Sequence, residues 1–438
     1  MHPLLSLPYA AAAGAADLLA RLPIGGEAKA WRAVRARRGL LERLEAWGRS
    51  HRDPARPLLW MHAPSVGEGL QARPVLERIR AAHPDWQLAY TFFSPSAERF
   101  AAALAADVVV DVADYLPFDS AHAARRLLDA LRPSALVFAK LDLWPRLAEA
   151  AHARGVPLGM VSATLSAGSG RRGTLARALL GDAYAALDAV GTIDPADGAR
   201  LAALGVRADR VRVTGDTRYD QVAARAAAVD RTGALLAPLT GDRPTLVAGS
   251  TWPADEAVLL PAWEAVRREV PHARLVIAPH EPTAAHLAPI DAWVARARTA
   301  DPALRAARLG DADATHDVVV VDRVGVLGEL YALATAAYVG GGFHAAGLHS
   351  VLEPAAFGAP VVFGPRHANS RDAGLLLAAQ GGAAVTDAAT AAETLAILLG
   401  EPDTRSRAGA AARGVVQTGL GAAERSAALV ASLVLRAR

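Results

Sequence analysis

The sequence predicts an α/β protein with two domains, each a doubly wound parallel sheet covered by helices. The chain has 438 residues, which suits two domains of about 200 residues each. Short, continuous apolar runs alternate with amphipathic helical stretches, the pattern of buried parallel strands joined by helices. The series of apolar runs stops once and then starts again, as expected where one domain ends and the next begins.

A short apolar segment comes before the first predicted strand. Residues 4–16 include Pro8 and Gly14 and are too few for a bilayer span, which needs about 20 apolar residues. No basic region precedes them, so a secretory signal fits poorly. Apolar Leu18, Leu19 and Leu22 follow, together with the cations Arg21, Lys29, Arg32, Arg35, Arg37, Arg38 and Arg43. This pairing predicts an interfacial segment on anionic lipid; the alternative is a helix packed on the domain with its arginines in solvent.

The first series of apolar runs begins at residue 58. The predicted strands are 58–63, 87–92, 107–112, 135–139, 157–163 and 189–193. Amphipathic stretches such as 70–82 and 120–131 separate them and predict the covering helices.

An Ala-rich helix at 219–229 and a turn-rich stretch at 230–244 predict the domain boundary. The second series follows, with strands expected at 245–250, 274–279, 317–322, 336–341 and 359–365. The resulting organisation is an N-terminal membrane-associating segment at 1–45, a first domain at 46–218, a linker at 219–240, a second domain at 241–412 and a C-terminal helix at 413–438.

Composition excludes several classes of protein. The net charge is only +3 and the lysines are Lys29 and Lys140 alone, so we expect no nucleic-acid partner. Cysteine is absent, which excludes a disulfide framework and a thiolate metal site. Metal sites built from histidine and carboxylate stay open, although no Asp-rich metal motif occurs, and we expect neither a metal nor a cofactor.

Residues 339–365 carry the strongest functional signal, because they predict a strand, a glycine-rich loop, a helix and a second strand. Gly340, Gly341 and Gly342 permit a sharp turn and a close ligand approach, and a helix beginning near His349 would point N–H groups at a phosphate. Glu353, about one turn inside that helix, could accept two ribose hydroxyl protons. The alternative is a tight strand-to-helix turn without a ligand.

Ligands bind at the carboxyl ends of parallel strands, which selects three loops in the first domain. Glu68 lies near a helix N-terminus after strand 58–63, ready to accept a proton or simply complementing the helix dipole. Ser94 and Ser96 could bind sugar or phosphate oxygens or cap a helix. Lys140 and Asp142 follow strand 135–139 beside Trp144, as a binding edge or a plain ion pair.

Similar loops follow the strands of the second domain. Gly249, Ser250 and Thr251 form a second candidate phosphate loop before Trp252, with an ordinary Ser/Thr cap as the alternative. His280 follows the next strand and could donate to a phosphate or hold its loop. Gly328 and Glu329 open a helix that could present N–H groups to a base or phosphate.

These motifs occur in an order that resembles one family. The motifs are Ser65–Glu68, Thr91–Ser96, Tyr115–Asp119, Lys140 with Asp142 and Trp144, Gly215–Asp220, Gly249–Trp252, Gly328–Leu330, and His349 and Ser350 with Leu352 and Glu353. Over roughly residues 55–395 the chain resembles the lipid A Kdo (3-deoxy-D-manno-octulosonic acid) transferases. The resemblance implies a GT-B fold of two facing Rossmann-like domains with an interdomain cleft, the acceptor on the first and CMP-Kdo on the second. It also implies association with the cytoplasmic side of the cell inner membrane, peripheral or monotopic, through its anionic surface.

The resemblance also implies roles for single residues. Glu68 matches the catalytic base, and Asp142 matches a functional glutamate that is one methylene longer. Lys140 stands where many members have another glutamate. Ser350 stands where the family usually has asparagine, and 163–166 lacks an arginine that many members place there. The acceptor residues would be Ser65, Gly67, Ser94, Ser96 and Lys140, and the donor residues Arg218, Gly249, Ser250, Thr251, His280, Gly328, Glu329, Gly341, Gly342, His349, Ser350 and Glu353.

The implied reaction transfers Kdo from CMP-Kdo to a lipid A precursor. Glu68 would deprotonate the acceptor hydroxyl, and helix N–H groups with Arg218 and His280 would stabilise the leaving phosphate without a divalent cation. A single displacement inverts the anomeric carbon. Two alternatives are a GT-B enzyme that uses another nucleotide sugar, and a non-catalytic membrane-bound paralogue that binds nucleotide or lipid, which the departures at Asp142 and Ser350 suggest.

Overall fold

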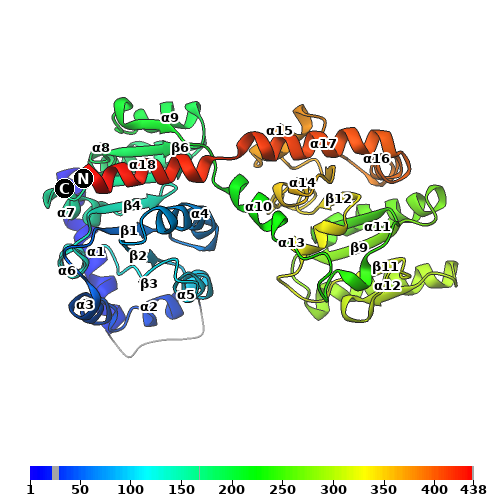
Figure 1. The fold of residues 1–438 in the computed structure, drawn as a ribbon, viewed down its shortest axis with the longest axis horizontal. Coiled ribbons are helices and arrows are strands. Elements are labelled where there is room, and N and C mark those ends of the chain that lie inside the picture. Colours follow the sequence, from blue (N-terminus) through cyan, green and yellow to red (C-terminus); the bar gives the residue numbers. More distant parts are fainter. Residues whose placement is uncertain (22–28, 167, 437–438) are drawn as a thin grey trace. The chain divides into compact units, whose positions relative to one another are not determined.

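The computed structural model describes residues 1–21, 29–166 and 168–436 and divides them into two compact units (Figure 1). The first unit comprises Met1–Gln221 together with Leu420–Arg438, and the second comprises Val222–Gly419. The chain therefore passes from the first unit to the second within helix α10 (Arg218–Ala227) and returns after residue 419.

The first unit is built on a parallel seven-stranded sheet. Its strands are β1 (Leu58–His62), β2 (Gln87–Phe92), β3 (Val112–Tyr115), β4 (Ala135–Ala139), β5 (Leu158–Ala163), β6 (Ala189–Thr192) and β7 (Val211–Val213). Their order is β3-β2-β1-β4-β5-β6-β7. Every residue of β1, β2, β4 and β5 is buried, because helices cover both faces and most residues of these strands are apolar.

Helices from both ends of the chain cover this sheet. They are α1 (Pro3–Arg21), α2 (Lys29–Arg35), α3 (Leu40–His51), α4 (Val66–Ala82), α5 (Glu98–Ala106), α6 (Ala121–Leu131), α7 (Pro145–Ala153), α8 (Thr174–Ala185), α9 (Pro195–Ala202) and α18 (Ala422–Arg436). Ser120 fixes the start of α6, since its hydroxyl accepts a hydrogen bond from Ala123 N at 3.1 Å. Helix α18, red in Figure 1, contacts α4, β5 and β6.

The second unit repeats the architecture with its own parallel seven-stranded sheet. Its strands are β8 (Thr245–Thr251), β9 (Arg274–Pro279), β10 (Ala306–Arg308), β11 (Val318–Val320), β12 (Ala336–Val339), β13 (Val361–Phe363) and β14 (Gly382–Ala384), in the order β10-β11-β9-β8-β12-β13-β14. Its helices are α11 (Pro253–Glu269), α12 (Ala284–Ala300), α13 (Leu327–Leu330), α14 (Leu352–Ala356), α15 (Arg371–Ala378), α16 (Ala388–Gly400) and α17 (Pro402–Gly419). Leu246 and Ala248 join one apolar cluster and Val247 joins another, so the sheet is buried on both faces.

Several sequence predictions need correction. The strand expected at 107–112 is wrong, since β3 begins only at Val112. Residues before it form a turn in which Val108 has a φ of 57° and is 69% exposed. The short strands β7, β10 and β14 were not predicted. The helix expected over 413–438 is two helices, α17 and α18, separated at Gly421, whose φ of 83° favours glycine.

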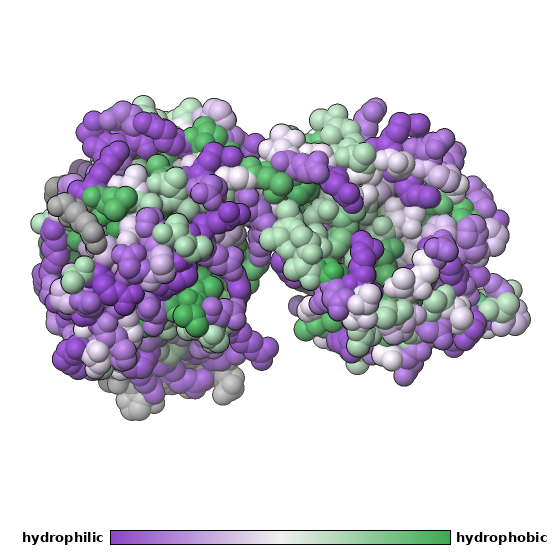
Figure 2. All heavy atoms as spheres, in the orientation of Figure 1, coloured by the Kyte–Doolittle hydropathy of each residue, from purple (hydrophilic) through white to green (hydrophobic). Residues whose placement is uncertain are grey.

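Helix α1 lies on the first unit through polar contacts. Tyr9 donates a hydrogen bond to Asp119 at 2.7 Å, Arg146 donates to Ser6, and Ser120 donates to Asp17. On the other side Leu4 and Leu7 are each 80% exposed, and Leu18 and Leu19 are also exposed. Apolar residues otherwise occur in scattered groups on the largely hydrophilic face in Figure 2. Across the described ranges, no helix is both long and apolar enough to cross a membrane.

One residue of the predicted cationic face is placed differently from the prediction. Arg37 is only 6% exposed. Its guanidinium donates to the carbonyl oxygens of Leu116, Phe93 and Ala33 and lies 4.0 Å from the ring centre of Phe93. Arg37 therefore connects the end of α2 to the segments at Phe93 and Leu116. It is not available to a lipid, because its N–H groups donate to these carbonyl oxygens. Leu22 lies outside the described residues.

Candidate functional site

Each sheet has a central point at which the chain leaves one half of the sheet for the other, and ligands of such folds bind beyond the carboxyl ends of the strands there. In the first unit this point lies between β1 and β4, and in the second unit between β8 and β12. The loops after β1 and β4 carry Glu68, Lys140 and Asp142. The loops after β8 and β12 carry the two glycine-containing segments, Gly249–Trp252 and Gly340–Gly342.

In the first unit, Ser65, Glu68 and Lys140 form one hydrogen-bonded group. Ser65 is the N-cap residue of α4 and its hydroxyl donates to Glu68 Oε2. Lys140 Nζ donates to Glu68 Oε1 at 3.1 Å. Lys140 reaches Glu68 from a left-handed backbone position with a φ of 59° immediately after β4, a conformation rare for residues other than glycine.

The charge state of Glu68 follows from these contacts. Burial raises the pKa of its carboxyl, but the hydrogen bond from Ser65 and the charge of Lys140 outweigh burial, so the pKa lies below its ordinary value. Glu68 is therefore a carboxylate at neutral pH. Gly67 beside it is exposed, and a Cβ there would meet only Ser65 Oγ at 3.8 Å. The protein itself thus does not require glycine at this position.

Asp142 belongs to a second group centred on His62. His62 is fully buried at the end of β1, and its Nε2 lies 3.1 Å from Asp142 Oδ2. Because a carboxylate only accepts hydrogen bonds, Nε2 carries the proton. Trp144 Nε1 donates to the same oxygen at 2.8 Å, and Thr91 Oγ1 lies 3.0 Å from His62 Nδ1. Burial raises the pKa of Asp142, but His62, Trp144 and the charge of Arg171 together hold it below its ordinary value.

His62 and Arg171 were missed by the sequence reasoning. His62 is a polar residue within the apolar run 58–63. Its position at the carboxyl end of the predicted strand is the signal that could have identified it as a site residue. Arg171 donates to the carbonyl of Leu141. Ser94 and Ser96 hydrogen-bond each other at 2.9 Å, and within the described ranges neither is bonded to Glu68, Lys140 or Asp142.

In the second unit, the backbone explains why the loop after β12 is rich in glycine. A Cβ on Gly340 would lie 2.1 Å from Ser250 O, and one on Gly342 would lie 2.4 Å from Gly364 N. Gly341 has a φ of 94°. The loops after β8, β12 and β13 therefore pack backbone against backbone, so the glycines are needed whether or not a ligand binds.

Asp255, the buried third residue of α11, holds this loop in place. Its carboxylate accepts from Gly341 N at 2.8 Å, Phe343 N at 3.1 Å and Trp252 N at 3.0 Å. The Gly341 N–H is therefore already used by the protein. The helix expected to begin near His349 begins at Leu352 and is only five residues long, so Glu353 lies in its first turn.

A cluster of aromatic rings lies beside the loop. Trp252 stacks on His344 with ring centres 4.2 Å apart and on His280 at 4.7 Å. Trp252 Nε1 donates to His349 Nε2 at 3.0 Å. His280 and His349 were predicted donor residues and lie together, whereas Trp252 and His344 had no predicted role in binding.

Glu353 and Gly328 lie together with Arg225 of α10, which the sequence reasoning missed. A Cβ on Gly328 would be 3.0 Å from Arg225 Nη2 and 3.9 Å from Glu353 Oε2. Burial raises the pKa of Glu353 above its ordinary value, and the charge of Arg225 opposes that rise. Glu353 thus belongs to a half-buried group at the start of α14.

The remaining predicted donor residues differ in their surroundings. Gly249 is buried, and a Cβ there would collide with the Tyr331 hydroxyl at 2.1 Å. Thr251 is buried and donates to Glu256 Oε1 at 2.8 Å, while Ser250 has a φ of 54°. Glu329 and Ser350 are exposed. Arg218 belongs to the first unit, where Asp216 accepts hydrogen bonds from it at 2.9 and 2.6 Å.

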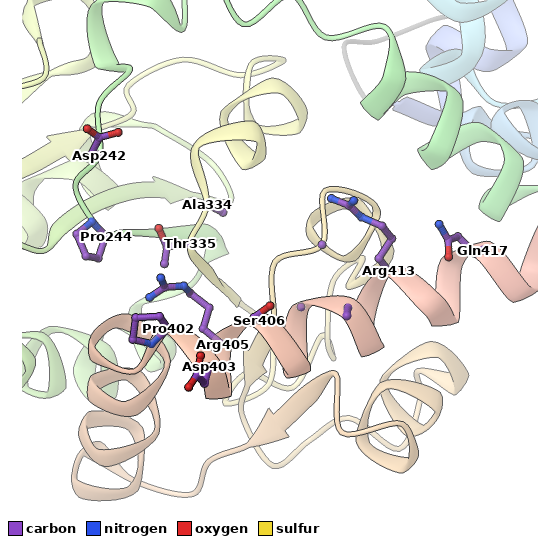
Figure 3. A pocket seen from close by; sticks show the side chains of 13 residues that line it. Asp242, Pro244, Ala334, Thr335, Pro402, Asp403, Arg405, Ser406, Arg413 and Gln417 are labelled. Atoms are coloured by element: carbon purple, nitrogen blue, oxygen red, sulfur yellow. The ribbon is translucent and has the colours of Figure 1, made fainter.

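A groove of about 870 Å³ lies at the amino ends of β8 and β12, away from the loops that carry the predicted site residues (Figure 3). Pro244 and Thr335, which directly precede β8 and β12, line it together with Arg405 and Arg413 of α17. Arg413 donates to Phe357 O at 2.7 Å. None of the predicted site residues lines this groove, so we place the candidate site at the carboxyl ends of the strands.

Comparison with known proteins identifies relatives over nearly the whole chain. The family model for 3-deoxy-D-manno-octulosonic-acid transferase (kdotransferase) matches residues 33–221. The 3-deoxy-D-manno-octulosonic acid transferase of Bordetella pertussis is 32% identical over 410 residues, which are 90% of this chain and 93% of the relative. The Haemophilus influenzae (strain ATCC 51907 / DSM 11121 / KW20 / Rd) protein of the same name is 27% identical over 399 residues, 89% of this chain and 90% of the relative.

A solved structure confirms the predicted fold class. UDP-GlcNAc 2-epimerase from Neisseria meningitidis, bound to UDP-GlcNAc, aligns with a TM-score of 0.61 and 13% identity over 86% of this chain and 100% of that chain. At this identity the likeness concerns the fold alone. The chain has the GT-B-type α/β fold with two parallel sheets.

Proposed function

Because this chain belongs to the 3-deoxy-D-manno-octulosonic acid (Kdo) transferase family, we propose that it is a glycosyltransferase that moves Kdo from CMP-Kdo to a lipid A precursor in lipopolysaccharide biosynthesis. The full-length similarity to the Bordetella pertussis relative is the observation that carries this proposal. Its chemistry is supported by the groups found at the central points of the two sheets.

Glu68 is the proposed general base of the first unit. Its carboxylate accepts the proton of the acceptor hydroxyl as that oxygen attacks the anomeric carbon of Kdo. The bond from the anomeric carbon to the phosphate oxygen breaks, and CMP leaves with the electron pair. One displacement at one carbon inverts its configuration. The Lys140 ammonium beside Glu68 keeps the carboxylate ionised before the acceptor arrives.

The other residues of the first unit would position the acceptor. Asp142 is held by His62 and Trp144 through one carboxylate oxygen, which leaves the second oxygen, Oδ1, to accept from a sugar hydroxyl. Gly67 offers a surface without a side chain beside Glu68, and Ser65, Ser94 and Ser96 supply hydroxyl groups.

The nucleotide is proposed to bind the second unit beyond β8 and β12. Glu353 would accept the hydroxyl protons of the ribose, because a carboxylate can accept from two neighbouring hydroxyls. Ser250, Gly328, His280 and His349 would surround the phosphate and base. Arg218, the first residue of α10, is also proposed to contribute to phosphate binding through its guanidinium.

We further propose that the protein acts at the cytoplasmic face of the inner membrane, in contact with anionic lipid. The exposed leucines of α1 support this placement, together with the exposed Arg32 that follows on α2. The helix would lie in the interface, with its polar side fixed to the protein by Tyr9 and Asp17.

The deciding experiment incubates the protein with CMP-Kdo generated in situ and a lipid A precursor, and weighs the product by mass spectrometry. Addition of one or more Kdo residues supports the proposal. A parallel calorimetric titration compares CMP with UDP. Tighter binding of UDP, without transfer of Kdo, would point to another nucleotide sugar, and CMP binding without any product would point to a non-catalytic relative.

A further inference from the structure

Trp252 and His349 form a hydrogen-bonded pair of nearly parallel rings beyond the end of β8 in the second sheet. The indole Nε1 donates to His349 Nε2 at 3.0 Å. Their ring planes are nearly parallel, with an angle of 8°, and the ring centres are 6.3 Å apart. The distance of 3.0 Å between the two nitrogens is that of an N–H to N hydrogen bond.

The direction of this hydrogen bond fixes the proton on His349. An indole nitrogen is a donor only, so Nε2 of His349 must supply a lone pair. A neutral imidazole carries one proton, which must then lie on Nδ1. A doubly protonated His349 would place two N–H groups against each other and lose the bond.

Neighbouring rings hold the pair in this arrangement. His280 stacks on His349 at 4.4 Å and also on Trp252 at 4.7 Å, so one imidazole covers both members. His344 lies parallel to the indole at 4.2 Å, with a 5° angle between the planes. Burial lowers the pKa of His349, and the charges of His280 and His344 lower it further, with Asp255 opposing, so neutral His349 is favoured.

The remaining ring nitrogen is left for a ligand. The Cδ2 edge of His349 faces Gly341, where a Cβ would lie only 3.2 Å away. For Nδ1 the described part of the chain supplies no hydrogen-bond partner, although the residue is only half-buried. Nδ1–H is a donor, so its partner must be an acceptor such as a phosphate or carboxylate oxygen.

We propose that Trp252 is a positioning residue, which locks His349 in the Nδ1–H tautomer so that this imidazole serves the nucleotide sugar as a neutral hydrogen-bond donor rather than as a cation or a base. The inference rests on the proposed donor site. It adds Trp252, which no part of the proposed function uses, and assigns His349 a single protonation state.

The tautomer is tested first, by ¹⁵N NMR of the histidine side chains in the ligand-free, full-length protein near neutral pH. The expected spectrum has a protonated Nδ1 and an unprotonated Nε2 for His349, assigned by its loss in His349→Gln. Trp252→Phe keeps a flat ring against His280 and His344 but removes the N–H, and should release His349 to a mixture of tautomers. A protonated Nε2 in the wild-type protein, or no change in Trp252→Phe, would overturn the inference.

The positioning role is tested with CMP as the probe. Trp252→Phe should weaken CMP binding by about two- to tenfold, the factor expected for one hydrogen bond. Trp293→Phe is the matched control, because it also removes an indole hydrogen bond in the second unit, from Nε1 to Glu264 at 2.8 Å, without touching this cluster. It should leave both the His349 spectrum and CMP affinity unchanged.

The two measurements separate failure of the inference from failure of the proposed function. A changed tautomer with unchanged CMP affinity in Trp252→Phe would defeat the positioning role alone. If the wild-type protein showed no CMP binding at all, the donor site would fail and the positioning role with it, while the NMR spectrum would still decide the tautomer. Circular dichroism and the thermal midpoint of each variant identify any loss of folding.

Discussion

Glu68, after β1, and Lys140, after β4, form a 3.1 Å ion pair, and this contact has two opposite effects on Glu68 as a base. The lysine keeps Glu68 ionised, which a base requires. It also lowers the pKa of Glu68, and a weaker base takes a proton less readily. The contact therefore sets a balance between the ionisation of Glu68 and its strength as a base.

Replacing Glu68 by glutamine should remove transfer and leave CMP binding nearly unchanged. The amide has the same shape but cannot accept the proton, and loss of a general base typically costs about 10² to 10⁴ in rate. The measurement is kcat for Kdo transfer, beside calorimetric titration with CMP. A variant that kept most of its kcat would exclude Glu68 from this role.

Replacing Lys140 by methionine should move the acid limb of the kcat/KM profile to higher pH. The ammonium lowers the pKa of Glu68, so its removal raises that pKa. As the pH falls, the base of the variant is then protonated at a higher pH than the base of the wild-type protein. Lys140→Arg keeps the charge and is the matched control, with a limb close to that of the wild-type protein. An acid limb at the same pH in Lys140→Met would show that another group controls it.

Replacing Glu353 by alanine should weaken CMP binding by roughly 1.5 to 3 kcal/mol, the range of hydrogen bonds to a charged group. Calorimetry with CMP and with cytosine base alone provides the comparison, since only CMP carries the ribose. Glu393→Ala serves as the control, because Glu393 is an exposed acid of α16 that no part of the proposed site uses. Equal CMP affinity in a folded Glu353→Ala protein would contradict the ribose assignment.

At the scale of elements, helix α1 divides cleanly into a side that holds the protein and a side that faces outward. Ser6, Tyr9 and Asp17 make hydrogen bonds to the first unit. Leu4 and Leu7 are the most exposed leucines of the helix. A helix with this division can lie on a membrane surface without being released from its own domain.

Changing Leu4, Leu7 and Leu18 to serine should reduce binding to anionic vesicles, because each leucine contributes apolar area to the lipid contact. Leu175→Ser in α8 is the matched control, since Leu175 is also 68% exposed on the first unit. Co-sedimentation at two salt concentrations provides the measurement.

The electrostatic part of the same interaction is tested by reversing Arg32, Arg35 and Arg38 to glutamate and leaving buried Arg37 unchanged. Vesicle binding should fall, and binding of the wild-type protein should weaken as salt rises. CMP affinity should not change. Binding that ignored both lipid charge and salt would contradict the proposed cationic contact.

The elements show what the sequence could and could not predict. Strands β1, β2, β4 and β9 agree with the prediction within a residue, because each is a buried parallel strand whose residues are mostly apolar. Residues 107–112 have the same apolar pattern, yet Val109 and Val110 are buried in a turn before β3. An apolar run therefore does not distinguish a buried strand from a buried turn. Strand β14 contains Gly382 and two alanines, too little apolar content for a signal.

Within the candidate site, local motifs were predicted but their partners were not. Asp142 and Glu353 were found from their motifs. Their neighbours His62 and Arg225 come from distant parts of the chain. The pairing of β1 with β4 brings His62 to Asp142, and the placement of α10 in the tertiary fold brings Arg225 to Glu353. Asp255 has no role in the sequence-based prediction, although it accepts three backbone hydrogen bonds from the surrounding loops.

At the scale of the whole molecule, the first unit is completed by the last helix of the chain. Val430, Leu433 and Val434 of α18 are buried in the core of that unit. Gly159 in β5 is matched to this helix, since a Cβ there would lie 2.6 Å from Leu433 Cδ1. The stability of the first unit thus depends on residues more distant in sequence than any in the second.

Replacing Leu433 by alanine should destabilise the first unit by about 2 to 5 kcal/mol through the cavity it leaves. Scanning calorimetry should show a lower unfolding temperature for that unit, and CMP should still bind the second unit with unchanged affinity. Leu435→Ala on the same helix, where the side chain is 52% exposed, is the control and should change little. Equal destabilisation of both units would mean that they unfold together.

The position of α18 also sets an order of events during synthesis on the ribosome. The second unit is one continuous stretch and can fold as soon as it has emerged, as domains generally do. The first unit, although translated earlier, must wait with the surface around Gly159 uncovered until the final helix is released. The first unit therefore completes its fold after the second unit, although its sheet is translated first. That sheet is exposed longest to aggregation and to chaperones.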